Sequence, residues 1–188
     1  MSWSRPRLIA GLAAVTLVIA GGLVWWFGPF RDRPWVPTCT DVAPGLQTEL
    51  GGTWTVTDPD EGRAKGKHQS TSRCTIAFVT ADQKYTGTLD LFTVVALDPD
   101  AGSKDVASAQ CGVTDKHVEV PQGYHAFRLC SQTNSTQTFV TVWAAKNDRW
   151  GTASVTINLR DNEQAATTYA NDLSRLAAKK ALTMSEPA

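Results

Sequence analysis

The sequence has no excess of charge of either sign, no internal repeat and no low-complexity tract. Its 188 residues contain 18 Lys and Arg and 18 Asp and Glu, so the formal net charge is +0. From Val36 onward the balance is slightly acidic, with 14 basic and 17 acidic side chains. Proteins that bind nucleic acid present a basic patch or stripe. The composition therefore predicts no nucleic-acid partner.

The sequence also lacks the common motifs of catalysis and metal binding. It has no Gly-x-Ser-x-Gly nucleophile elbow, no phosphate-binding loop and no His-Glu-x-x-His pair. None of its four cysteines belongs to a Cys-x-x-Cys pair, which is a usual spacing of zinc ligands. We therefore predict no catalytic residue, no cofactor and no metal ion.

One uninterrupted apolar run extends from Leu8 to Phe27. Its 20 residues carry no charge, and a helix of that length matches the ~30 Å hydrocarbon core of a bilayer. Trp25 and Trp26 stand at its far end, where aromatic rings favour the headgroup region. A cleaved signal peptide has a shorter apolar region and ends at small residues, and no cysteine closes the run for lipid attachment. The run predicts an uncleaved signal anchor that crosses the membrane once.

The cysteines indicate on which side of the membrane the rest of the chain lies. All four follow the apolar run, and an even number fits disulfides in an oxidising compartment. The flanking arginines lean only slightly towards a cytoplasmic N-terminus. Of the three possible pairings we favour Cys39 with Cys74 and Cys111 with Cys130, each of which would attach a helix to a strand. We therefore predict a single-pass protein of the cell membrane with an extracytoplasmic C-terminal domain.

These features divide the chain into five parts. They are a short cytoplasmic N-terminus (1–7), the transmembrane signal anchor (8–27), a Pro/Arg spacer (28–37), an extracytoplasmic α+β domain (38–183) and a tail (184–188). A domain of this length can bury a single hydrophobic core.

Within the domain, periodicity predicts a helix, three strands, a helix, four strands and a last helix. The helices are expected at 41–50, from 98 or 100 to 111, and at 162–182, and the strands at 53–58, 73–80, 86–98, 116–120, 124–131, 137–145 and 150–159. Asp41 and Asp161 are the expected N-caps of the first and last helices, with Pro44 in the first turn. Residues 59–71 are polar and are expected to form a mobile loop. This order predicts an α+β fold with a mostly antiparallel sheet and flanking helices, similar to an α/β/α sandwich.

Four segments of the domain are similar to a known family. They are Cys39 opening a short helix that ends at Gly51-Gly52, a strand with Trp54, the stretch Arg73-Cys74-Thr75-Ile76, and Ala170-Asn171-Asp172-Leu173-Ser174-Arg175-Leu176-Ala177. Over most of residues 36–183 the chain resembles small anchored envelope proteins and lipoproteins of actinobacteria, many of them domains of unknown function. Some of these have a PsbP-like α/β/α sandwich, a fold also found in the external sensor domain of a mycobacterial receptor kinase. Many relatives carry a lipidated cysteine where this chain has an apolar span. The resemblance implies a fold and a location but no functional residues.

Three residues are candidates for a catalytic site. His117 and Glu119 would share one face of a strand, and His125 lies on the next strand. A metal-binding or general-base role requires these side chains to converge, whereas histidines at a sheet edge are otherwise solvent-facing.

Two further features allow a binding role. Trp143 and Trp150 flank a hairpin turn, where they either anchor a partner or a sugar or, as we favour, form a cross-strand pair that stabilises the sheet. A cluster of basic residues either contacts anionic lipids or wall polymers or is a solvated loop. It consists of Arg63, Lys65, Lys67 and His68.

From these features we expect a non-enzymatic binding, sensor or accessory module of the cell envelope. The membrane holds it through Leu8 to Phe27, and its partner is an envelope protein or a small ligand. The alternative is a hydrolase or transferase that acts on envelope material through His117, Glu119 and His125.

Overall fold

The computed structural model describes residues 34–64, 69–96, 99–111, 115–116, 118–159 and 162–186. The chain divides after Arg33, and every described residue belongs to the second unit, Pro34–Ala188. The predicted membrane span from Leu8 to Phe27 lies outside these ranges. No helix within them is long and apolar enough to cross a membrane.

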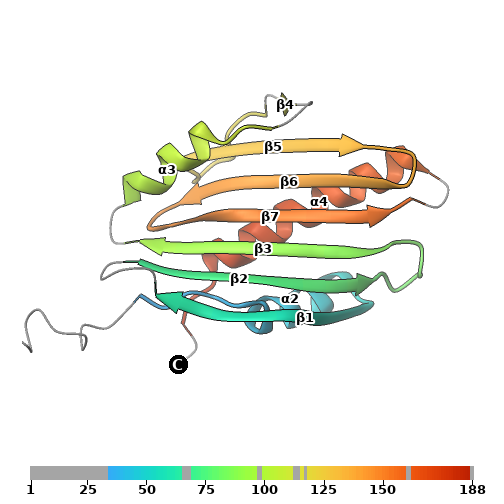
Figure 1. Cartoon of the computed structure of the whole chain (residues 1–188), viewed down its shortest axis with the longest axis horizontal. Coiled ribbons are helices and arrows are strands. Elements are labelled where there is room, and N and C mark those ends of the chain that lie inside the picture. Colours follow the sequence, from blue (N-terminus) through green and yellow to red (C-terminus); the bar gives the residue numbers. More distant parts are fainter. Residues whose placement is uncertain are drawn as a thin grey trace, which may run out of the picture. The chain divides into compact units, whose positions relative to one another are not determined.

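The described unit is α+β and follows the predicted order of elements. The helices and strands are α2 (Cys39–Leu50), β1 (Thr53–Ala64), β2 (Gln69–Val79), β3 (Thr86–Ala96), α3 (Pro99–Ser108), β4 (Asp115–Lys116), β5 (Ala126–Thr133), β6 (Gln137–Lys146), β7 (Arg149–Asn158) and α4 (Glu163–Thr183). The strands form one sheet in the order β1-β2-β3-β7-β6-β5-β4 (Figure 1). All neighbouring strands are antiparallel. The predicted α+β class with a mostly antiparallel sheet is confirmed.

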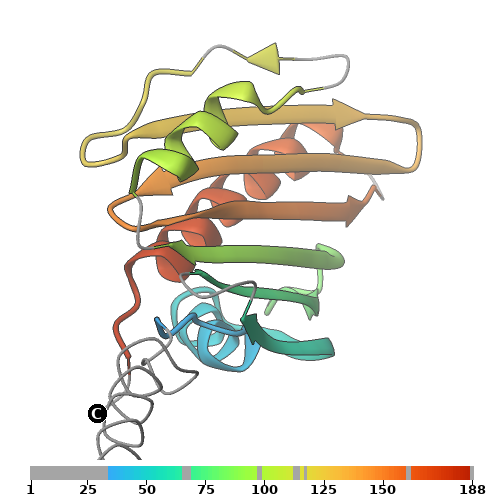
Figure 2. The same ribbon diagram turned by 60° about the vertical axis from the view of Figure 1, so that its left-hand side comes forward.

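Helices lie on both sides of the sheet but cover them unequally. α4 packs against β6 and β7, and α2 packs against β1, β2 and α4, all behind the sheet in Figure 1. We call this side the covered face. α3 lies on the other side, where it contacts β5, β6 and β7 near one end of the sheet, as Figure 2 also shows. We call this second side the open face, because no described helix lies over the opposite end of its strands.

The core lies between the sheet and the pair α2 and α4. Alternation along β7 puts Ala153, Val155 and Ile157 on the covered face, where all three are fully buried. α4 meets them with a stripe made largely of alanines, whose small side chains allow the helix to lie close to the strands. A disulfide between Cys39 and Cys74 attaches α2 to β2. Both cysteines are buried in the core, so the bond that joins the first helix to the sheet is shielded from solvent.

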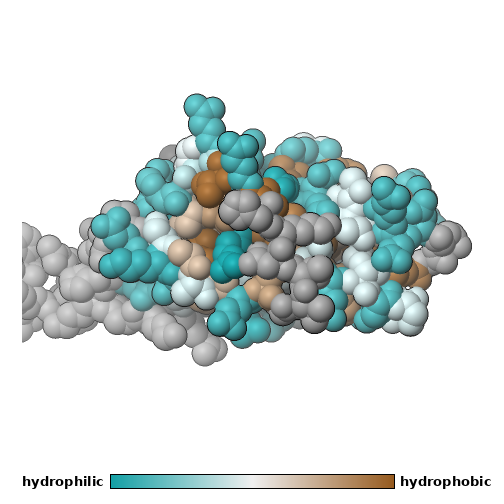
Figure 3. All heavy atoms as spheres, turned by 90° about the horizontal axis from the view of Figure 1, so that it is seen from above, coloured by the Kyte–Doolittle hydropathy of each residue, from teal (hydrophilic) through white to brown (hydrophobic). Residues whose placement is uncertain are grey.

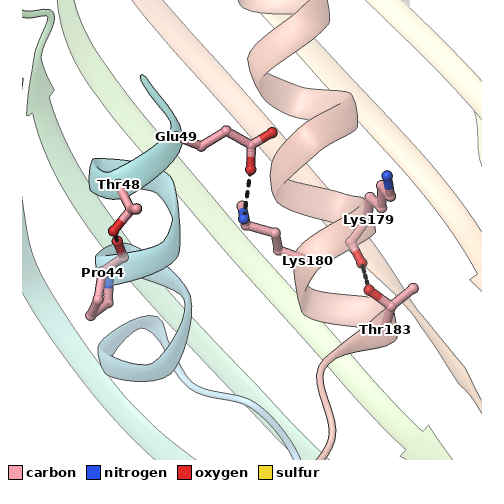
Figure 4. A network of polar contacts seen from close by, with 6 residues as sticks. All are labelled: Pro44, Thr48, Glu49, Lys179, Lys180 and Thr183. Atoms are coloured by element: carbon pink, nitrogen blue, oxygen red, sulfur yellow. Dashed lines mark hydrogen bonds and ion pairs between the residues drawn. The ribbon is translucent and has the colours of Figure 1, made fainter. Parts of the chain in front are cut away.

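An ion pair joins the two helices of the covered face at their outer surface. Lys180 Nζ of α4 lies 2.8 Å from Glu49 Oε2 of α2 (Figure 4). Thr48 Oγ1 and Thr183 Oγ1 each donate to the carbonyl four residues earlier in their own helix. The pair is partly exposed, so we assign it a small share of the stability.

α3 is held on the open face by apolar and polar contacts. Val106 of α3 and Val94 of β3 are fully buried, and the Arg128 guanidinium of β5 donates to the carbonyl oxygens of Ala107 and Ala109. A second disulfide, Cys111–Cys130, joins the segment after α3 to β5. Both disulfides are the pairs that we favoured from the sequence.

The helix starts differ from the predicted caps. Thr38 is the N-cap of α2, and Asp41 Oδ2 accepts from its backbone N at 2.8 Å and from its hydroxyl at 2.7 Å. Asp41 is therefore the third helical residue of a capping box, and Pro44 lies in the second turn. α4 is capped by Asn162, whose side chain accepts from Ala165 N at 3.0 Å. The expected cap Asp161 lies outside the described residues.

The predicted mobile loop over residues 59–71 is wrong. β1 continues to Ala64 and β2 begins at Gln69, so most of this stretch is a hairpin. Its register shifts between Val56 and Asp58 and again between Asp60 and Arg63. Pro59 is tolerated because β1 is the outermost strand, where a missing N–H removes no bond to a further neighbour.

The short segment before α2 belongs to the folded unit. Val36 and Pro37 are buried, and the Arg149 guanidinium lies 5.5 Å from the centre of the Trp35 ring. Arg149 also donates to the carbonyl oxygen of Met184. The entry and the exit of the domain therefore meet at the start of β7, and packing begins before residue 38.

Candidate functional site on the open sheet face

The three candidates for a catalytic site are not seen together in the described part of the chain. His117 lies outside the described residues. Glu119 follows β4 and His125 precedes β5, and both side chains are exposed. No hydrogen bond or ion pair joins these two side chains, and no group of three or more His, Cys, Asp or Glu within the described ranges could hold a metal ion.

The two tryptophans of the hairpin are not opposite each other. Trp143 pairs with Thr152 and Trp150 pairs with Ala145, so the expected cross-strand pair is wrong. Trp150 instead lies edge-on to Phe92, with ring centres 5.6 Å apart. It also contacts α3 so closely that a Cβ on Gly102 would lie 2.4 Å from its ring. Trp150 therefore anchors α3.

The basic cluster cannot be placed as a group. Lys65, Lys67 and His68 lie outside the described residues, and Arg63 belongs to β1 without a described side chain.

The edge of the sheet near β4 shows hydrophilic and apolar side chains side by side. Figure 3 looks onto this edge and displays brown and teal residues intermixed. Val120 is 46% exposed here. Single exposed apolar residues are normal on a protein surface and need no partner.

Hydroxyl and amide side chains form rows across the uncovered part of the open face. Strand register places these rows side by side: Thr86, Asn158 and Gln137; then Thr88, Thr156 and Phe139; then Thr75, Asp90, Ser154 and Thr141. Several of these groups bond across the strands. Thr75 Oγ1 donates to Asp90 Oδ1 at 2.6 Å, and the Thr141 and Ser154 hydroxyls lie 2.9 Å apart. The face is polar but carries little charge.

A cavity of about 280 Å³ opens at the first two rows. Its lining residues come from four strands and are Phe78, Thr86, Gly87, Thr88, Gln137, Thr156 and Asn158. In Figure 1 the ends of β6 and β7 that contribute Gln137 and Asn158 are on the side away from α3. Five of the lining side chains belong to the rows of the open face, so the cavity opens on that face.

Gly87 shapes the floor of the cavity. A Cβ at this position would lie 2.0 Å from the Thr156 carbonyl oxygen and 3.0 Å from Phe78 Cζ. Only a residue without a side chain allows β3 and β7 to approach this closely. The Phe78 ring itself is buried in the core beneath this point, with 2% of its surface exposed.

Stacked aromatic rings support the floor from the covered face. The rings of Phe78 and Trp54 stack with centres 5.1 Å apart, and Tyr169 lies 6.4 Å beyond Phe78. Tyr85 stacks on Tyr169 at 4.9 Å. Burial raises the pKa of Tyr169, with smaller contributions from the charges of Asp82 and Tyr85. The phenol therefore stays neutral at physiological pH, and the floor is aromatic and uncharged.

A tight turn joins β2 to β3 beside these rings. The Thr80 hydroxyl donates to Asp82 Oδ1 at 2.6 Å, and the Lys84 amide donates to the same oxygen at 3.1 Å. These two bonds lower the pKa of Asp82. Gln83 takes the left-handed conformation that the turn requires, with φ 57°.

The chemistry of the lining favours binding over catalysis. Its polar side chains are three threonines, one glutamine and one asparagine, and none of these is an acid or a base near neutral pH. Each hydroxyl and each amide can both donate and accept hydrogen bonds. The cavity can therefore orient a polar ligand but offers no group that transfers a proton at neutral pH.

None of the cavity residues was a candidate from the sequence. Alternation along 150–159 places the polar residues of that strand on one face, and such a face ordinarily faces solvent. The missing information is the pairing of β7 with β3, which joins residues about seventy positions apart. The polar row Thr152, Ser154, Thr156 and Asn158 on one face of that strand is the signal that the sequence contains.

Comparisons of the chain with protein-family models, curated proteins and solved structures find no match. The function is therefore inferred from the chemistry of this chain's own residues.

Proposed function

We propose that this chain is a membrane-anchored extracytoplasmic module of the cell envelope that binds a ligand on the open face and catalyses no reaction. The observation that carries the proposal is the cavity of about 280 Å³ lined by hydroxyls and amides. Ligand sites contain a few convergent polar groups that fix the orientation of the ligand. Here five polar side chains supply these groups.

Two features support the proposed location. Both pairs of cysteines form disulfides, and no described cysteine is free. Structural disulfides persist mainly outside the cytoplasm. The apolar run from Leu8 to Phe27 has the length of a membrane span. Together they fit a single transmembrane helix with the oxidised domain beyond it.

The proposed relationship to actinobacterial envelope proteins rests on the sequence motifs named above. The layering of α2 and α4, the sheet and α3 supports an α/β/α sandwich, and its PsbP-like character is part of the proposal. One difference is that α3 covers only part of its face. In this proposal the uncovered part is the place where the domain meets its ligand.

The test compares two substitutions on the same face in the full-length protein, isotope-labelled and held in detergent micelles. Thr88→Arg fills the cavity, whereas Gln132→Arg puts the same side chain on β5, outside it. Fractions of the source organism's envelope are added, and the backbone amide signals of Gly87 and Thr156 are followed by NMR. We expect a fraction that shifts these signals in the wild type and in Gln132→Arg but not in Thr88→Arg.

Two results would overturn the proposal. One is that no envelope fraction shifts the cavity signals. The other is a ligand that shifts the signals of Glu119 and His125 alone and is chemically altered on incubation. This second result would support the hydrolase or transferase alternative.

A further inference from the structure

The cavity carries no charge that would select a charged ligand. None of its seven lining residues is ionisable near neutral pH. On the adjoining part of β3, Asp90 is the next side chain of the open face after Thr88, and the Thr75 hydroxyl already donates to it at 2.6 Å. A phosphate or carboxylate ligand is normally met by Arg or Lys. The lining therefore suits a neutral ligand.

The polar groups are suited to a ligand with several adjacent hydroxyls. Gln137 Nε2 donates to Asn158 Oδ1 at 3.0 Å, which holds the two amides in one orientation at the rim. In this orientation Gln137 Oε1 remains an acceptor and the Asn158 NH₂ group remains a donor. Thr86, Thr88 and Thr156 add hydroxyls that can donate or accept. Neighbouring hydroxyls of a ligand, each both donor and acceptor, match this mixture.

An aromatic residue of β6, Phe139, lies next to a lining residue of the cavity without being part of the lining itself. Phe139 is the direct cross-strand partner of Thr156 and projects from the same face, so the two Cβ atoms are about 5 Å apart. The ring is half-buried and leaves part of its surface to solvent. Aromatic rings supply large apolar contact area, which the C–H face of a sugar ring can cover. The cavity volume of about 280 Å³ is just below the ~300–1,000 Å³ range of ligand pockets, which suits no more than about one sugar ring.

We infer that the open-face cavity binds a neutral saccharide, with the two amides and three hydroxyls on its hydroxyl groups and Phe139 against its C–H face. This inference rests on the proposed function, because it names the ligand class of the same site. Any further sugar units would lie outside the cavity, along the rows of Ser154 and Thr141.

Two experiments test the ligand class in the full-length protein. The fluorescently labelled protein in detergent micelles is applied to an array of neutral, acidic and amino saccharides. We expect binding to one or more neutral members and at least about tenfold weaker binding to the matched members with a carboxylate or an ammonium group, since the cavity has no counter-charge for them. Four substitutions are then compared on the neutral member that binds best.

Asn158→Ala and Phe139→Leu should each weaken binding about tenfold, which is the size expected for losing ligand hydrogen bonds or an aromatic contact. Phe139→Tyr keeps the ring and should bind like the wild type, so a loss in Phe139→Leu alone identifies the aromatic contact. Gln47→Ala is the matched control, because it removes an exposed amide on α2, on the covered face and away from the cavity. Thermal unfolding of each variant shows whether a loss of binding reflects a loss of folding.

The possible results separate this inference from the proposed function. Binding to charged members alone, or to no member while an envelope fraction still shifts the Gly87 and Thr156 signals, overturns the saccharide and leaves the proposed function standing. Equal weakening by Asn158→Ala and Gln47→Ala overturns the assignment to this cavity. If neither the array nor any envelope fraction gives binding, both the saccharide and the proposed function are wrong.

Discussion

The side chains of Gln137 and Asn158 are hydrogen-bonded to each other at 3.0 Å, although they lie at the start of β6 and the end of β7. They are also opposite residues in the strand register. Pairing at the open end of a hairpin brings together two amides that are 21 positions apart in the sequence. The rim of the cavity therefore depends on this hairpin and on the neighbouring strand β3.

Gly87→Ala is expected to destabilise the protein and to weaken ligand binding. Its Cβ would lie 2.0 Å from a backbone oxygen of β7, so the strands must move apart. Overpacking of this kind costs about 1–3 kcal/mol. Urea unfolding of Gly87→Ala and of the wild type measures the change in the free energy of unfolding.

Gly45→Ala is the matched control. Its nearest contact would be the flexible Lys180 side chain at 3.4 Å. Gly45 lies inside helix α2, where alanine is favoured over glycine by about 0.5–1 kcal/mol. Equal stability changes of the same sign in both variants would contradict the role given to Gly87.

The two disulfides are expected to differ in how readily they are reduced. Cys39 and Cys74 are 1% and 3% exposed, whereas Cys111 and Cys130 are half-buried. Access of the attacking thiolate controls the rate of exchange, so a dithiol reductant should open Cys111–Cys130 first in the native protein. Alkylation at successive times, followed by peptide mass spectrometry, measures the order. Earlier alkylation of Cys39 and Cys74 would show that the α2 side of the core opens first.

Loss of either disulfide should destabilise the domain strongly. The bonds span 35 and 19 positions of the chain, which corresponds to ~3–4 kcal/mol each in the chain-entropy model. The paired replacements Cys39→Ala with Cys74→Ala, and Cys111→Ala with Cys130→Ala, test this by denaturant unfolding. A change below about 1 kcal/mol in either pair would show that the reduced, unfolded chain retains structure.

The ion pair between Glu49 and Lys180 is expected to contribute little. Its side chains are 51% and 23% exposed, and exposed pairs are worth about 0.2–1 kcal/mol and weaken with added salt. Glu49→Gln should therefore lower the free energy of unfolding slightly at low salt and not at high salt. Glu186→Gln, at an exposed position after α4, is the control and should have no effect at either salt concentration. A salt-independent loss in Glu49→Gln would point to packing instead of charge.

The turn between β2 and β3 should make stability depend on acid pH through Asp82. Hydrogen bonds from Thr80 and Lys84 lower the pKa of Asp82 in the folded state. A carboxylate with a lowered folded pKa stabilises the protein above its unfolded pKa, and this contribution is lost as the pH falls through the folded pKa. The difference in Tm between the wild type and Asp82→Asn should therefore be present at neutral pH and disappear in acid. A difference that stays constant across this range would exclude ionisation as its cause.

Much of the fold could be predicted from short-range patterns. The order of helices and strands, the buried faces of β3 and β7 and the amphipathic α4 all follow from apolar spacing, because side-chain direction repeats every two residues in a strand and every 3.6 in a helix. The misplaced features have local physical causes as well. Pro59 indicates a loop unless its strand is known to be an edge, and Asp41 resembles a cap because it belongs to the capping box that Thr38 begins.

The candidate site could not be predicted in this way. Trp143 and Trp150 appeared to be partners because they flank one turn, but the register of the hairpin offsets them and α3 packs on Trp150. Glu119 and His125 are near in sequence, yet both project into solvent. The place of Trp150 depends on α3, an element far from the hairpin in the sequence, and local patterns do not show that contact.

Local periodicity was enough to establish the α+β class and the faces of the elements, since each depends on residues within one or two turns of the chain. The insertion of β7 between β3 and β6 is different, because strand pairing is decided by the packing of the whole core. That pairing sets Thr88 beside Thr156 and Gln137 beside Asn158, and it brings the backbone of Gly87 against β7. The polar cavity is therefore a property of the assembled sheet.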